Sequence, residues 1–227
     1  MKKRITLACA LLCMSMTAAY AEEAELTTEQ QQFSYVAAFQ FIQHYKSQGI
    51  PLDEAAVVQA IKDTMAGGEL KLTPQEMQAV FQSFQQKRAA QLQAIANENL
   101  KMGQEFLEKN KDKEGITSLD SGIQYKVLNK GSGKSPSVTD TVSVHYRGTL
   151  INGLEFDSSY KRGEPVTFGL GNVIRGWQEI LPLMKEGDKW QVFIPSDLAY
   201  GPPGRPGSII GPNSTLIFDI ELMSVAQ

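Results

Sequence analysis

The stretch 216-LIFDIEL-222 alternates apolar and acidic side chains close to the end of this 227-residue chain. Successive side chains of a β-strand point to opposite faces of the sheet. The apolar residues at positions 216, 218, 220 and 222 would therefore share one face, while Asp219 and Glu221 would share the other. This pattern predicts a strand of an antiparallel sheet with one buried and one solvated face. The apolar members are Leu216, Phe218, Ile220 and Leu222.

The same alternation recurs upstream and predicts further strands. It involves Ile123, Tyr125 and Val127; Val142, Val144 and Tyr146; and Trp190, Val192 and Ile194. Between these strands, one short amphipathic helix is indicated by Trp177, Ile180, Leu181 and Met184. A sheet with a single helix packed on one face is an α+β domain.

The chain changes character near Gly115, because glycine and proline are sparse before it and frequent after it. The earlier part reads as helical. We expect a first helix from Thr27 or Thr28 to about Gln48 and a second over 52–65. A third begins at a capping box, with Thr73 as N-cap, Pro74 at N1 and Glu76 at N3, and extends to about residue 111.

The first helix carries two apolar stripes, which must both be covered. The stripes are Phe33, Ala37 and Phe41, and Tyr35, Phe39 and Ile42. One interpretation is a small helical domain folded against the long helix. The other is an intertwined homodimer through residues 22–72, which is favoured because so short a segment rarely forms a stable core alone. The third helix has a thin stripe interrupted at Arg88, which favours a spacer between domains over an ordinary coiled coil.

The N-terminus has the pattern of a secretory signal peptide over residues 1–21. A basic start is followed by an apolar run from Ile5 to about Met16 and by an Ala-x-Ala site ending at Ala21. The apolar run is too short for a permanent transmembrane segment. Both cysteines, Cys9 and Cys13, would be removed with it. We therefore expect an exported protein, in the periplasm or, alternatively, at the outer-membrane surface.

Charge and motif content exclude several classes of function. Loss of three of the 22 basic residues with the signal segment leaves 19 against 25 acidic ones, a net charge of −6 that argues against nucleic acid as a partner. The stretch 131-GSGKS-135 fails the phosphate-loop pattern, because Leu128 stands where that pattern needs a glycine. His44 and His145 have no sequence context typical of a metal site or a nucleophilic triad. No metal or cofactor is expected.

The stretch 173-VIRGW-177 places a tryptophan directly after a glycine. We interpret Trp177 as the flat floor of a pocket, with Gly176 letting the chain turn. By composition alone, however, the aromatic residues of this half are more typical of a hydrophobic core than of a site. Asp157, followed by Ser158 and Ser159, could equally be ordinary turn chemistry.

Five motifs in order decide between these interpretations: VHYRGTL, FDSS, VIRGWQEIL, MKEGDKWQVFIPSDLAYG and STLIFDIEL. Together they resemble the FKBP-type peptidyl-prolyl isomerases. PLDEAAVVQAIKDTMAGG and LTPQEMQAVF resemble the dimerisation domain of exported bacterial members, the macrophage infectivity potentiator group. The resemblance implies a five-stranded antiparallel sheet wrapped on a short helix over 115–227. It also implies an all-α dimerisation domain over 22–72 and a long connecting helix over 73–114.

The resemblance also implies a site. Asp157, Tyr200 and Phe218 would be catalytic. Substrate would be bound by Tyr146, Phe156, Val166, Phe168, Val173, Ile174, Trp177, Ile209 and Ile210. The Ile174 N–H and the Tyr200 hydroxyl would hold a substrate carbonyl, and Asp157 would act electrostatically. Val166 stands where an aromatic residue is frequent, and Arg205 where some members carry histidine.

Proline-containing polypeptides and unfolded exported proteins are the implied partners, and macrolide FKBP inhibitors the implied ligands. Isomerisation would assist the folding of exported proteins without covalent catalysis, and the dimeric arms would add chaperone activity. The alternatives are a dimeric holdase, or a surface interaction protein, with a weak or secondary isomerase domain.

Overall fold

The computed structural model describes residues 25–226, so the signal segment expected over 1–21 lies outside the described residues. Three helices come first in the chain: α1 (Glu29–Ser47), α2 (Glu54–Ala66) and α3 (Pro74–Asn110). The expected bounds agree with these to within two residues. The chain divides into two compact units, of which the second begins at Tyr45 inside α1 and holds α2, α3 and the sheet.

Local chemistry defines the helix ends. The side chain of Asp53 caps α2 by accepting a hydrogen bond from the Ala56 N–H at 2.8 Å. At the start of α3, the expected capping box is present, since Thr73 and Glu76 bond each other's backbone N–H. Each cap satisfies a donor that a helix start otherwise leaves free.

The apolar residues of α1 and α2 are exposed in the single chain, and neither helix contains a buried residue. Phe33 is 72% exposed and Tyr35 is 59% exposed, and Phe39 and Ile42 are also open to solvent. Contiguous exposed apolar surface of this kind is unusual on a monomeric protein. Each of the two predicted stripes therefore has exposed members, Phe33 in one and Tyr35, Phe39 and Ile42 in the other.

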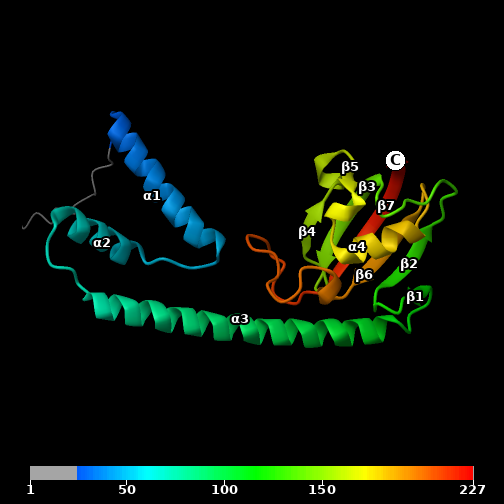
Figure 1. Ribbon diagram of the computed structural model, residues 1–227, viewed down its shortest axis with the longest axis horizontal. Helices are drawn as coiled ribbons and strands as arrows, with labels where there is room; N and C mark the ends of the chain where they lie inside the picture. The colour runs from blue at the N-terminus through cyan, green and yellow to red at the C-terminus, as the bar shows by residue number, and fades with distance from the viewer. Residues whose placement is uncertain (1–24, 227) are drawn as a thin grey trace, which may run out of the picture. The chain divides into compact units, whose positions relative to one another are not determined.

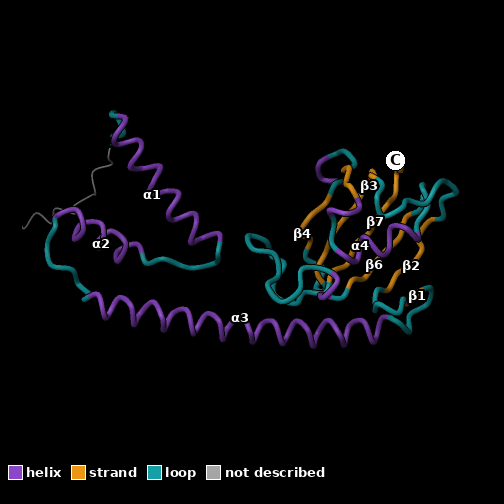
Figure 2. Tube along the Cα trace, viewed as in Figure 1, coloured by secondary structure: helices purple, strands orange, loops and turns teal. Residues whose placement is uncertain are grey.

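The C-terminal part is an antiparallel sheet (Figures 1 and 2). Its strands are β1 (Ile116–Ser118), β2 (Gln124–Asn129), β3 (Thr141–Leu150), β4 (Glu155–Ser158), β5 (Val166–Gly169), β6 (Lys189–Ile194) and β7 (Leu216–Ala226). The order is β1-β2-β6-β7-β3-β4, with β5 paired to β3. The strand predicted from LIFDIEL is β7, which lies in the middle of the sheet between β6 and β3.

Seven strands are described where the family resemblance implied five. Both β4 and β5 pair with β3, the first along 147–149 and the second along 141–144. They thus form two parts of one interrupted edge, and β1 adds three residues at the opposite edge. The remaining strands, β2, β6, β7 and β3, are the four that alternation predicts.

One face of the sheet packs on α4 (Arg175–Ile180), which continues into a 3-10 turn over Leu181–Leu183. Trp177, Ile180 and Leu181 enter the core shared with β3, β6 and β7. Gly176 lies within α4, where an added Cβ would come within 2.5 Å of the Ile194 side chain. The expectation that Gly176 turns the chain is therefore wrong. The glycine is needed because the helix approaches β6 closely.

The end of α3 packs on the sheet domain through amides and a glycine. Asn99 Nδ2 donates to the Pro212 carbonyl at 2.8 Å, and the buried Asn110 amide donates to Gln124 Oε1 at 2.9 Å. Gly103 lies so close to Thr215 that a Cβ would meet its Oγ1 at 2.2 Å. The C-terminal portion of the expected spacer is thus attached to the sheet domain. No helix within residues 25–226 is long and apolar enough to cross a membrane.

Candidate active site

Nine of the twelve residues expected at the site line one cavity of about 280 Å³ between α4 and the sheet. They are Tyr146, Phe156, Asp157, Phe168, Val173, Ile174, Trp177, Tyr200 and Phe218. Asn172 and Arg205 complete the lining. The strands β3, β4, β5 and β7 contribute side chains, as do α4 and the segment before it. Residues far apart in the sequence therefore converge here.

Trp177 lines this cavity and is almost fully buried. Its ring meets those of Tyr146, Phe168 and Phe218 nearly edge-on, with centroids 5.4, 5.8 and 5.3 Å away. Edge-to-face contacts are a favoured geometry for aromatic pairs. The indole nitrogen is buried and finds no acceptor among the described residues. The lining around Trp177 is therefore apolar and aromatic.

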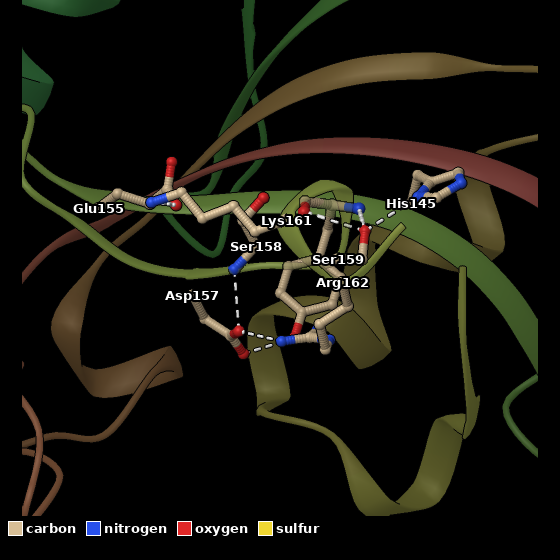
Figure 3. A network of polar contacts seen from close by, with 8 residues as sticks. His145, Glu155, Asp157, Ser158, Ser159, Lys161 and Arg162 are labelled. Carbon is tan, nitrogen blue, oxygen red and sulfur yellow. Dashed lines mark hydrogen bonds and ion pairs between the residues drawn. The ribbon is translucent and has the colours of Figure 1, made fainter. Parts of the chain in front are cut away.

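One edge of the cavity is polar and is built around Asp157 on β4 (Figure 3). The Tyr146 hydroxyl donates to Asp157 Oδ2 at 2.5 Å, and Arg162 donates to Oδ1 at 2.6 Å. Arg162 also donates to the Tyr146 hydroxyl oxygen at 2.9 Å. The Ser158 N–H adds a bond to Oδ1 at 2.8 Å. This closed network holds the carboxylate in one orientation.

The network shifts the ionisation of both acidic groups. Burial by itself would raise the pKa of Asp157, but the hydrogen bonds from Tyr146 and Arg162 and the guanidinium charge lower it overall. Burial, reinforced by the bond to Asp157, raises the pKa of the Tyr146 hydroxyl. At neutral pH, Asp157 is therefore an anion and Tyr146 keeps its proton.

Ser159 anchors this segment to β3. Its Oγ accepts from the Tyr146 N–H at 2.8 Å and lies 3.0 Å from His145 Nδ1. Its own N–H donates to the Tyr146 carbonyl at 2.9 Å. The side chain is fully buried, and Figure 3 shows it beside His145. FDSS is therefore more than a solvent-exposed turn, because its second serine ties Asp157 to the strand that carries Tyr146.

A second cavity of about 510 Å³ adjoins the first. Phe156, Asp157 and Arg205 line both, and Glu155 and residues 206–209 complete the second. Glu155 forms ion pairs with Arg147 and Lys161, both at 2.8 Å. The two cavities thus share lining residues on β4 and in the loop that carries Arg205.

Three expected residues lie outside the Trp177 cavity. Val166 is on β5, partly buried against the core. Ile209 lines the second cavity, whereas Ile210 is buried with the core residues. Sequence reasoning also missed Arg162, which completes the polar edge. Its only signal was a basic residue five positions after Asp157, which is easily taken for a solvated loop charge.

Within the described residues, no three His, Cys, Asp or Glu side chains gather as a metal site would require. The site consists of an aromatic and apolar lining and one fixed carboxylate. Such a site can bind a compact apolar group such as a proline ring and orient dipoles at its edge.

Comparisons with known proteins agree with this geometry. Residues 132–223 match the model of the FKBP-type peptidyl-prolyl cis-trans isomerase family, and residues 30–127 match the domain amino-terminal to such isomerases. The chain is 44% identical to the outer membrane protein MIP of Legionella longbeachae, covering 99% of this chain and 98% of the relative. It is 41% identical to the peptidyl-prolyl cis-trans isomerase Mip of Coxiella burnetii, covering 89% of each.

Among solved structures, FkpA from Escherichia coli aligns with a TM-score of 0.62 at 37% identity. The alignment covers 89% of this chain and 99% of that one. Sequence, fold and relatives over nearly the whole length thus agree, and the chain belongs to the FKBP-type peptidyl-prolyl cis-trans isomerases.

Proposed function

We propose that the Trp177 cavity is where this isomerase turns X–Pro bonds, with the proline ring resting on the indole. One observation carries the proposal: a buried indole face surrounded edge-on by three aromatic rings, with a fixed carboxylate at the rim. The cavity volume of about 280 Å³ has room for a proline ring and part of its neighbour.

Rotation about the X–Pro bond crosses a barrier of about 18–20 kcal/mol, because amide resonance must be broken. The uncatalysed step takes tens to hundreds of seconds. A gain of about 10⁵ in rate would require about 7 kcal/mol, at 1.36 kcal/mol per tenfold. No covalent bond has to form. A twisted amide is less charge-separated than a planar one, so an apolar cavity disfavours the planar ground state.

The polar groups of the site would orient the substrate carbonyl. The Ile174 N–H finds no acceptor among the described residues, which leaves it available to a ligand. Tyr200 lines the same cavity and supplies a hydroxyl. Asp157 accepts from Tyr146 and Arg162 and holds no proton to give at neutral pH, so its contribution is electrostatic.

Two substitutions test this assignment. Asp157→Ala removes the fixed charge and Phe218→Ala removes an aromatic wall. Both are expected to lower kcat/KM on an X–Pro peptide by about tenfold or more, which corresponds to about 1.4 kcal/mol or more in the barrier. Asn129→Ala, an exposed amide outside the cavity, is the matched control. Full activity in both site variants, with an unchanged circular dichroism spectrum, would contradict the assignment.

The helical part supports a second role. We propose that the exported chain forms a homodimer through residues 22–72 and that its arms hold unfolded clients near the isomerase sites. The exposed stripes of α1 and the exposed α2 favour this, because a dimer would cover them. Export rests on the pattern of residues 1–21. The periplasm is the proposed location, with the outer-membrane surface as the alternative.

A further inference from the structure

Arg205 lies on the rim that the two adjoining cavities share. Its loop is held by backbone bonds, since the Arg205 N–H donates to the Ile210 carbonyl at 2.9 Å and the Ser208 N–H donates back to Arg205 at 3.1 Å. The guanidinium carbon lies 5.7 Å from the centre of the Tyr200 ring. The cation is therefore held beside the proposed proline site.

The charges around this rim are unevenly paired. Each carboxylate that lines the second cavity already has cationic partners, because Glu155 pairs with Arg147 and Lys161, and Asp157 with Arg162. Within residues 25–226, no carboxylate oxygen lies within 4.0 Å of the Arg205 guanidinium. The rim thus has an unneutralised positive charge, although the chain as a whole is acidic, with a net charge of −3.

We propose that Arg205 recognises an acidic side chain next to the proline of the substrate. The inference rests on the proposed function, in which the proline occupies the Trp177 cavity. Because Phe156, Asp157 and Arg205 line both cavities, a residue flanking that proline passes from the first cavity into the second. A guanidinium presents paired N–H donors that match a carboxylate in shape and charge.

The expected effect is modest because Arg205 is exposed. Exposed ion pairs change an equilibrium by about two- to fivefold, and salt screens them. The preference should therefore appear in kcat/KM at low ionic strength and fade in about 1 M salt, where the screening length falls to about 3 Å.

The experiment uses the full exported chain and X–Pro peptides that differ only in Glu, Gln or Lys, placed directly before or directly after the proline. The ratio of kcat/KM for Glu over Gln is measured for wild type, Arg205→Gln and Arg205→Glu. Lys130→Gln is the control, an exposed cation in the turn after β2 that lines neither cavity.

We expect a Glu-to-Gln ratio of about two to five in wild type and Lys130→Gln, at one of the two positions. The ratio should fall to about one in Arg205→Gln. In Arg205→Glu it should reverse, so that the Lys peptide becomes the preferred one. A reversed preference would distinguish recognition of charge from an indirect effect of the substitution on Tyr200. The indirect effect would change kcat/KM for all peptides alike.

A wild-type ratio of one at both positions, or a ratio that survives in Arg205→Gln, would overturn the inference. If the Gln peptide is still isomerised and a macrolide FKBP inhibitor blocks it, only the role of Arg205 fails. If no peptide is isomerised, or the inhibitor has no effect, the proposed function fails and the Arg205 inference fails with it.

Discussion

At the scale of single residues, the site is governed by how Asp157 is held. Three hydrogen-bond donors fix its carboxylate: the Tyr146 hydroxyl, the Arg162 guanidinium and the Ser158 N–H. An anion at the edge of an apolar cavity is costly unless such donors surround it. These donors stabilise the charge and also hold the carboxylate in one orientation.

The lowered pKa of Asp157 predicts the acid limb of the pH profile. We expect kcat/KM on an uncharged peptide to be flat from about pH 8 down to about pH 5 and to fall only below the usual carboxyl range near pH 4. Since the folded-state pKa lies below the unfolded value, ionised Asp157 stabilises the fold above that unfolded value. This stabilisation is lost as the pH falls through the folded-state pKa.

The check is a rate profile and a thermal melt across this range for wild type and Asp157→Asn. The variant should have a lower isomerisation rate. Its stability should also depend less on pH in the acid range, because the contribution of ionised Asp157 is absent. An inflection of the wild-type rate near pH 6 or 7 that disappears in Asp157→Asn would contradict the lowered pKa.

Arg162 should matter through Asp157 and Tyr146 rather than by contact with substrate, because it lines neither cavity. Arg162→Gln is expected to lower kcat/KM several-fold and to move the acid limb of the rate profile to higher pH, since the guanidinium that lowers the pKa of Asp157 is lost. Lys161→Gln, which removes an exposed neighbour bound to Glu155, is the matched control. An unmoved acid limb in Arg162→Gln would show that the ion pair does not tune Asp157.

The aromatic members of the cavity, Trp177 included, were found in the sequence through the family motifs, because the expectation that the glycine beside Trp177 turns the chain does not hold. The motifs could not identify Arg162, because the closed network with Tyr146 forms only when β3 and β4 pair. They also placed both Ile209 and Ile210 at the site, whereas Ile209 lines the second cavity and Ile210 is buried in the core. A loop without periodicity gives no indication of which side chain turns inward.

Among the helices and strands, the features that local chemistry determines are those that the sequence predicts best. The capping box of α3, the ends of α1 and the four alternating strands all appear where they were expected. The strands β1, β4 and β5 have only three or four residues, too few for alternation to be recognised. Their positions are set by pairing with β2 and β3 instead.

The attachment of α3 to the sheet domain was also hidden from the sequence. Besides one aromatic contact, in which the ring centres of Phe106 and Phe193 lie 5.9 Å apart, its contacts include those of Asn99, Gly103 and Asn110, which contribute nothing to an apolar stripe. The hydrophobic period alone therefore predicts a poorly buried helix along this length. The structure shows that a helix can also dock through buried amides and a close approach of its backbone.

Gln124 connects the two elements, because its amide donates to the Leu107 carbonyl at 2.8 Å and accepts from buried Asn110. Gln124→Ala leaves the Asn110 amide without that acceptor, at a cost of about 1–3 kcal/mol in the free energy of unfolding. Urea unfolding of the sheet domain measures this. Asn129→Ala, an exposed amide on β2, should change stability by no more than about 0.5 kcal/mol. Equal effects of the two substitutions would show that α3 is not held through Gln124.

At the scale of the whole molecule, we expect the exposed helical part and the isomerase site to be separable. A fragment of residues 91–227 keeps the contacts between α3 and the sheet domain and omits α1 and α2. It should be a monomer, retain kcat/KM on a short peptide, and lose protection of an unfolding protein against aggregation. The protection should be lost because two sites linked in one dimer act on a shared client at a higher effective concentration than two separate monomers do.

Light scattering coupled to gel filtration gives the oligomeric state, and aggregation of a denatured client gives the protection. A full-length chain that remains monomeric at all concentrations would contradict the dimer, as would a dimeric 91–227 fragment. Substituting Phe33 and Phe39 by Ser in the full chain should reproduce the fragment's behaviour, because both residues lie on the exposed faces of α1.

A measurement of the isomerisation rate tests most directly whether the cavity over Trp177 performs the reaction. The cis-to-trans relaxation of a short uncharged X–Pro peptide would be followed with the exported protein, with and without a macrolide FKBP inhibitor. We expect catalysis well above the uncatalysed relaxation and its abolition at stoichiometric inhibitor. Catalysis that persists with saturating inhibitor bound, or a folded protein without catalysis, would contradict it.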